Sequence, residues 1–68
     1  MINVSDASHL NRLYRKYVSE RGDIDVDRLY DVLLREKRAA EQGRIRVSMG
    51  LRRELRADLA YVGRVRNA

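Results

Sequence analysis

The chain has 68 residues and a formal net charge of +5, from 15 Lys and Arg against ten Asp and Glu. This length allows one small domain, because a chain of about 60 residues buries only roughly 60% of the surface that its unfolded form exposes. Cysteine is absent and there is one histidine, which excludes disulfides, thiolate metal sites and a zinc site built from several histidines. Self-association therefore remains as the expected aid to stability.

The positive charge is concentrated in one part of the chain. Residues 1–43 carry eight basic and eight acidic side chains, whereas residues 44–68 carry seven arginines and only two acids, Glu54 and Asp58. Seven minus two is five, so the whole excess lies in residues 44–68. Arginine can hold a phosphate or a guanine edge through two parallel hydrogen bonds, so this asymmetry indicates an anionic partner.

The first predicted element is a helix over residues 6–21. Its apolar residues recur at the spacing of one helical face. They are Leu10, Leu13, Tyr14, Tyr17 and Val18. Ser5 is expected to be the N-cap, and Gly22 is placed to end the helix.

A second helix is predicted over residues 26–42, with Asp25 as its N-cap and Gly43 at its end. Its apolar residues follow the same spacing. They are Val26, Leu29, Tyr30, Leu33 and Leu34. Because the connection between the two predicted helices is short, we expect an antiparallel helical hairpin.

Residues 44–49 alternate polar and apolar side chains, as a half-buried strand does. A single strand needs a partner for its backbone groups, so the segment either pairs with the same segment of a second chain or is not a strand. In the second case, Ile45 and Met49 lie one helical step apart on an extended third helix. From residue 51 onward the helical spacing returns. The apolar residues at this spacing form one stripe along the predicted helix, and they are Leu51, Leu55, Leu59, Val62 and Val65.

The stretch RIRVSMGLRRELRADLA, residues 44–60, resembles the opening of a ribbon-helix-helix repressor. That resemblance implies that two chains pair one strand each into a ribbon that enters the major groove of DNA. The residues directed at base edges would be Arg44, Arg46 and Ser48. Those pointing inward would be Ile45, Val47 and Met49, with Leu51, Leu55 and Leu59 in the dimer core. The second helix of the family has no counterpart in residues 61–68.

Other motifs favour ordinary structural roles. The run 23–27 resembles the start of a calcium loop, but Arg28 and Leu34 stand where glycine and glutamate are needed. His9 has no paired carboxylate in its pattern, and Tyr61 lies beside the apolar stripe, so packing or surface positions are expected for both. We find no catalytic or cofactor motif, and we expect neither an enzyme nor a metal or cofactor site.

The predicted fold is therefore a mainly helical single domain, with a neutral antiparallel helical hairpin followed by a basic amphipathic helix. In one of the two alternatives for residues 44–49, a short strand precedes this helix and pairs with its counterpart in a homodimer. The predicted function is nucleic-acid binding, DNA rather than RNA, by a small cytoplasmic regulator of the kind that phages and plasmids encode. The alternative is a protein-interaction module for an acidic surface. No signal peptide or membrane span is expected. The predicted binding residues are Arg44, Arg46, Arg52, Arg53, Arg56 and Arg64.

Overall fold

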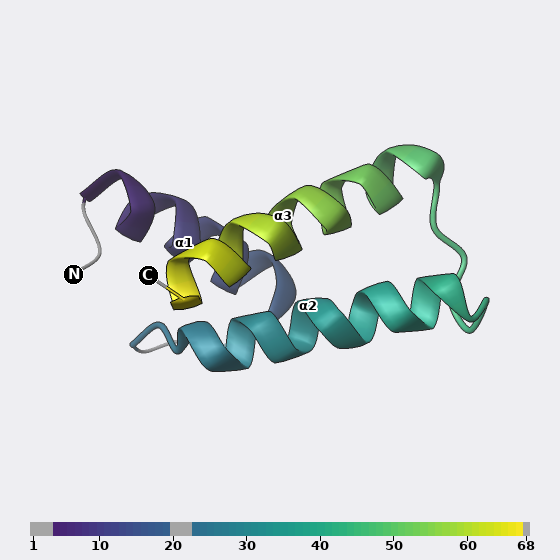
Figure 1. The fold of residues 1–68 in the computed structure, drawn as a ribbon, viewed down its shortest axis with the longest axis horizontal. Helices are drawn as coiled ribbons and strands as arrows, with labels where there is room; N and C mark the ends of the chain where they lie inside the picture. Colours follow the sequence, from purple (N-terminus) through teal and green to yellow (C-terminus); the bar gives the residue numbers. More distant parts are fainter. Residues whose placement is uncertain (1–3, 20–22, 68) are drawn as a thin grey trace.

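A computed structural model describes residues 4–19 and 23–67 of the chain. Three helices make up most of it: α1 (Val4–Tyr17), α2 (Val26–Glu41) and α3 (Met49–Asn67). Figure 1 shows α2 and α3 side by side and running in opposite directions, with α1 crossing behind α3. The mainly helical class predicted from the sequence is confirmed, and no described residue belongs to a strand.

The direction of α1 is set by its contacts along α3. Asp6, near the start of α1, accepts a hydrogen bond from Tyr61, near the end of α3. Lys16, near the end of α1, pairs with Glu54, near the start of α3. The two helices therefore run in opposite directions.

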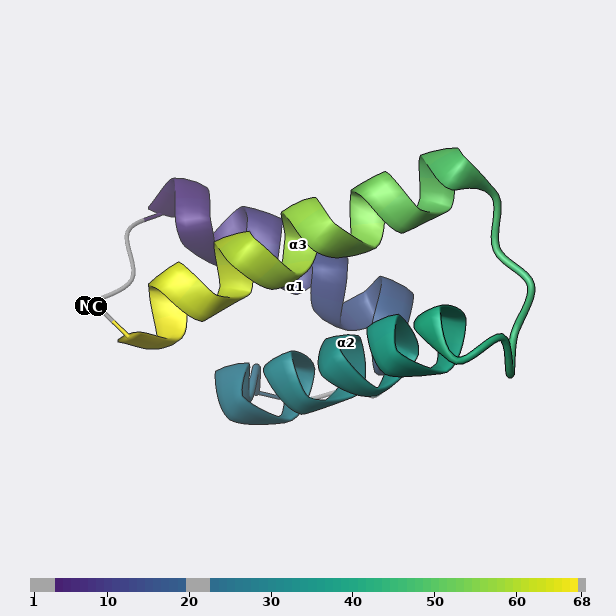
Figure 2. The ribbon, with the colours of Figure 1, turned by 45° about the vertical axis from the view of Figure 1, so that its right-hand side comes forward.

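The predicted antiparallel hairpin of α1 and α2 is wrong. Asp27, near the start of α2, pairs with Arg66 at the end of α3, so α2 also runs opposite to α3. Consequently α1 and α2 run in the same direction, which Figure 2 shows from a second side. Eight residues separate these helices along the chain, a length that allows two helices running in the same direction, and apolar side chains of both join those of α3 in one core.

The core lies where the three helices meet. Its wholly buried side chains come from every helix, and they are Leu10, Leu29, Leu33 and Val62. Leu55 is 3% exposed, and Leu59 and Val65 pack against this cluster, which confirms most of the predicted stripe of α3. Leu51 is the exception at 36% exposure, because it lies in the first turn of α3, at the edge of the packed region.

The ends of α1 differ from the prediction. The helix already includes Val4, so Ser5 lies inside the first turn and is not the N-cap. The helix ends at Tyr17, and Ser19 adopts the left-handed region with φ of 60°. This conformation ends the helix before Gly22, the predicted terminator, which lies outside the described residues.

Both ends of α2 are as predicted. The Asp25 side chain accepts a hydrogen bond from the Arg28 backbone N–H at 3.2 Å, as an N-cap does. At the other end, Gly43 has a φ of 71°, a conformation that glycine adopts without steric cost. Local chemistry is therefore sufficient to set the limits of this helix.

Residues 44–48 form an irregular linker in this chain, neither a strand nor an extension of α3. The predicted alternation persists in the burial, because Ile45 and Val47 are half-buried and the other three side chains are exposed. Met49, predicted to point inward, is 68% exposed. The reason is local: Ser48 Oγ accepts a hydrogen bond from the Leu51 N–H at 3.1 Å, so α3 begins here and the alternation stops.

Candidate nucleic-acid interface

The two acidic residues within residues 44–68 both have partners on α1. Glu54 lies 3.2 Å from the Lys16 ammonium, and Asp58 accepts a hydrogen bond from the Tyr17 hydroxyl at 2.8 Å. Their charges are therefore directed toward the side of α3 that packs on α1. The Glu54 side chain is still 60% exposed, but it lies on this side of the helix, whereas the exposed arginines of α3 other than Arg66 have no carboxylate partner within the described residues.

The environment of Tyr17 reinforces this arrangement. Burial raises the pKa of the Tyr17 hydroxyl far above its ordinary value, and the hydrogen bond to Asp58 and the nearby negative charges raise it further. Tyr17 is therefore a neutral donor at physiological pH, and it binds the Asp58 carboxylate without neutralising its charge.

Tyr61 belongs to the packing of α1 against α3. Its hydroxyl donates to Asp6, and this hydrogen bond is the largest cause of a raised pKa for Tyr61. The His9 ring meets the Tyr61 ring edge-on at a centroid distance of 4.4 Å. Tyr61 therefore has the packing role expected of it, and His9 is a half-buried residue at the boundary between α1 and α3, in line with the expected surface or boundary position.

Arg66 is used within the fold. Its Nε lies 2.6 Å from an Asp27 carboxylate oxygen, and its guanidinium lies 4.9 Å from the centre of the Tyr30 ring. The hydrogen bond to Asp27 raises the pKa of Arg66. One of the seven arginines of residues 44–68 thus joins the end of α3 to the start of α2.

The six predicted binding arginines are all exposed, and none makes an ion pair within the described residues. Five of them belong to the linker and the first two turns of α3, so the structure brings them to one end of the molecule (Figure 1). We call these five the basic end: Arg44, Arg46, Arg52, Arg53 and Arg56.

Two of the six arginines, Arg64 and Arg44, differ from the rest in their surroundings. Arg64 lies eight residues beyond Arg56, or about 12 Å along the helix axis, with its guanidinium 5.9 Å from the centre of the Tyr61 ring. Arg44 lines a shallow hollow together with Arg35 and Glu36 from α2. Arg64 is therefore separate from the basic end, whereas Arg44 belongs to it and lies near charged residues of both signs on α2.

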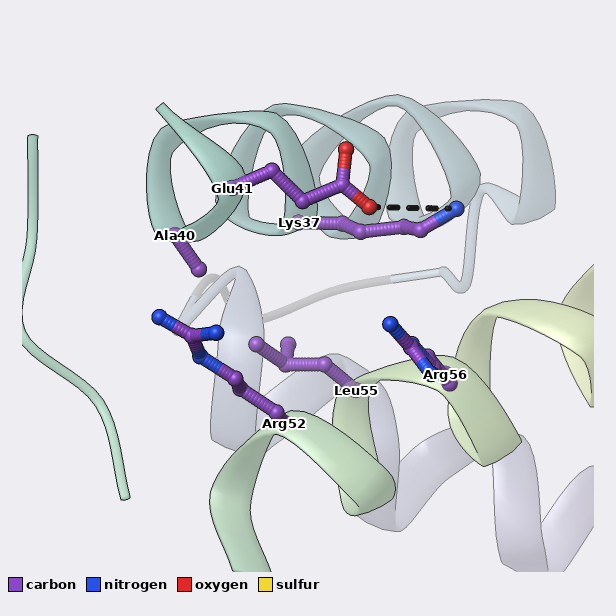
Figure 3. Close-up of a pocket in the computed structure, with 6 residues that line it drawn as sticks. All are labelled: Lys37, Ala40, Glu41, Arg52, Leu55 and Arg56. Carbon is purple, nitrogen blue, oxygen red and sulfur yellow. Dashed lines mark ion pairs between the residues drawn. The ribbon is translucent and has the colours of Figure 1, made fainter. Parts of the chain in front are cut away.

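A second hollow, of about 20 Å³, lies between the end of α2 and the start of α3. In Figure 3, Arg52 and Arg56 rise from α3 on either side of Leu55 and reach toward α2. Lys37 lines the same hollow from α2, where it pairs loosely with Glu41 at 3.7 Å. Sequence reasoning missed Lys37, because it belongs to the neutral half of the chain and its i,i+4 spacing to Glu41 is typical of a solvated pair.

No protein-family model matches the chain, and no curated protein or solved structure matches it. The resemblance to ribbon-helix-helix repressors consequently stays a prediction. Within residues 4–19 and 23–67, no helix is long and apolar enough to cross a membrane, and no group of three or more His, Cys, Asp or Glu is arranged to hold a metal ion.

Proposed function

We propose that the protein binds nucleic acid through the basic end, with Arg64 as an additional contact further along α3. The observation that supports this proposal is the separation of charge around α3. Glu54 and Asp58 are directed to α1 and have partners there, whereas the exposed arginines have no carboxylate partner within the described residues. The protein is then a binding protein, with no catalytic group assigned.

The shape of α3 suits a phosphate backbone. Arg53 and Arg64 are eleven residues apart, which is three turns and places them on the same side of the helix, about 16 Å apart along its axis. The exposed residues between them on this side include Ala57 and Ala60, which let the helix come close to a groove. We propose that DNA is preferred to RNA, since its major groove admits a helix whereas that of A-form RNA excludes side chains.

The proposal predicts a steep dependence of affinity on salt. Each phosphate contact contributes about −0.9 to the slope of log K against log salt on duplex DNA. Four contacts give a slope of about −3.6, so the affinity falls roughly 100-fold between 50 and 200 mM salt.

The test is a titration of a fluorescent random duplex, and of the matching RNA duplex, at several salt concentrations. The triple variant Arg52→Gln, Arg53→Gln, Arg56→Gln should lose about 2.7 of the slope. The matched control, Arg12→Gln with Arg15→Gln and Arg35→Gln, removes the same charge from exposed positions on α1 and α2 and should retain most of the slope. Absence of binding to any nucleic acid at 50 mM salt contradicts the proposal.

A protein partner with an acidic surface is the second candidate, and one observation favours it. Met49 is 68% exposed and Leu51 is 36% exposed, beside the arginines of the basic end. Apolar residues next to arginine are typical of protein interfaces, whereas phosphate binding gives them no role. Loss of partner capture on Met49→Ser, with DNA binding unchanged, would favour this candidate.

We also propose that the protein acts as a homodimer through the linker. The backbone N–H groups of residues 45–48 donate no hydrogen bond within the described part of the chain, so they are available to a second copy of the same segment. Sedimentation at several concentrations tests this, because a monomer at every concentration excludes the pairing. The cytoplasmic location stays a prediction.

A further inference from the structure

We infer that the hollow between α2 and α3 binds one phosphate group, held by Lys37, Arg52 and Arg56. This inference rests on the proposed nucleic-acid binding and specifies it: it adds α2 to the interface and makes Lys37 a binding residue. The phosphate can belong to a nucleic-acid backbone or to a 5′-phosphorylated end, since both present the same tetrahedral oxygens.

The positions of the three cations carry the inference. Arg52 and Arg56 are four residues apart, so their Cβ atoms lie about 5–6 Å apart on one side of α3. That side faces α2, and both side chains reach toward α2 on either side of Leu55, in the hollow that Lys37 also lines (Figure 3). Three cationic side chains from two helices thus line one hollow, although like charges at the spacing of Arg52 and Arg56 oppose helix stability. An anion in the hollow would remove that repulsion.

The charge and size of the hollow select the ligand. Three cations and Glu41 give a net charge of +2, which is enough to balance the single negative charge of a backbone phosphodiester or the nearly double charge of a 5′-phosphate. A volume of about 20 Å³ is room for one or two water molecules, which excludes a nucleobase and leaves room for phosphate oxygens at the mouth. Ala40 and Leu55 form an apolar floor that keeps water from one side of the bound group and strengthens its ion pairs.

Inorganic phosphate is the first probe, added to the isotope-labelled full chain and followed by the backbone amide signals in NMR. Phosphate should cause saturable shifts at Ala40, Glu41 and Leu55, and sodium chloride at equal ionic strength should not. Lys37→Gln and Arg56→Gln should each abolish saturation without lowering the melting temperature, because neither removes a stabilising ion pair between helices. Shifts that are absent, or equal in chloride, overturn the inference.

Nucleic acid is the second probe. Lys37→Gln should reduce the salt slope of DNA binding by about 0.9, the contribution of one phosphate contact. The matched control is Lys16→Gln, since Lys16 also pairs with a glutamate and is similarly exposed, at 48% against 35% for the Lys37 side chain. Equal losses for the two lysine variants would show a general effect of charge and would overturn the role of Lys37.

The two probes separate the two proposals. Saturable phosphate binding without DNA binding retains the site and contradicts the proposed function. DNA binding that depends on Arg53 but not on Lys37, with no phosphate shifts, retains the proposed function and contradicts the site. Oligonucleotides with a 5′-phosphate and with a 5′-hydroxyl distinguish the two sources, because only an end-binding site prefers the first.

Discussion

The two ends of α3 carry arginines in different surroundings. At the C-terminal end, Arg66 pairs with Asp27 at 2.6 Å and lies over the Tyr30 ring. At the N-terminal end, Arg52 and Arg56 face a lysine across a hollow and have no carboxylate partner among the described residues. The residue type is the same, but the first end uses its charge to join two helices and the second leaves it available.

This difference shows how one helix serves both the fold and a surface. An arginine with a carboxylate partner contributes to holding the helices together, and its charge is balanced. Arginines grouped without carboxylates repel one another, so the isolated fold gains nothing from their charge. A ligand that supplies the missing negative charge gives these residues a physical reason to be together.

The largest expected effect is on stability. It tests whether the basic end rests on a packed core, as the C-terminal end of α3 does. Leu55 lies beneath the basic end at 3% exposure, so Leu55→Ala should cost about 2–5 kcal/mol. That is a large part of the roughly 3–10 kcal/mol expected for a domain of this size. Urea unfolding measures the loss, with Leu51→Ala as the control at 36% exposure. Equal losses for both variants would mean that the basic end has no core beneath it.

A smaller loss of stability is expected on the side of α3 that faces α1, where Glu54 and Asp58 lie. Tyr17→Phe removes the hydrogen bond to Asp58 and should cost about 1 kcal/mol at pH 8. The folded protein raises the pKa of Tyr17 above its unfolded value of 10.0, so this stabilisation is complete below pH 10 and is lost as the pH rises toward the folded pKa. The difference between wild type and Tyr17→Phe in guanidinium unfolding should therefore shrink between pH 8 and pH 11. A constant difference would contradict the assigned cause.

The smallest effect compares the two kinds of arginine directly. Arg66→Gln should lower the melting temperature slightly, because it removes the ion pair with Asp27 and the contact with Tyr30. Arg53→Gln should leave the melting temperature unchanged or raise it slightly, since Arg53 has no ion pair among the described residues. Differential scanning fluorimetry at low salt measures both, and high salt should reduce the difference. A larger loss for Arg53→Gln would contradict the distinction between the two ends.

Local sequence signals predicted much of the fold. The Asp25 cap and the Gly43 terminator are both present. The predicted burial of Leu55 and Val62 is also confirmed. These features depend on residues within about one helical turn of each other, or on the period of one helix.

The errors lie where residues distant in sequence decide. The hairpin of α1 and α2 was predicted from a short connection, but the connection is long enough to let both helices pack on α3. Arg52 and Arg56 were predicted only as binding residues, and their place in a hollow with Lys37 was not predicted. Neither fact follows from periodicity, because periodicity describes one helix and says nothing of which neighbour covers its edges.

The amino-acid sequence alone therefore determines three amphipathic helices, both ends of α2 and an arginine excess within residues 44–68. Only the tertiary structure decides that Glu54 and Asp58 meet α1, that Arg66 meets Asp27, and that Lys37 joins two arginines. The physical reason is the separation along the chain of the residues that interact. Helices and caps form between neighbours, whereas the contacts that direct the acids away from the arginines join residues 38 and 41 positions apart and exist only once the helices have packed.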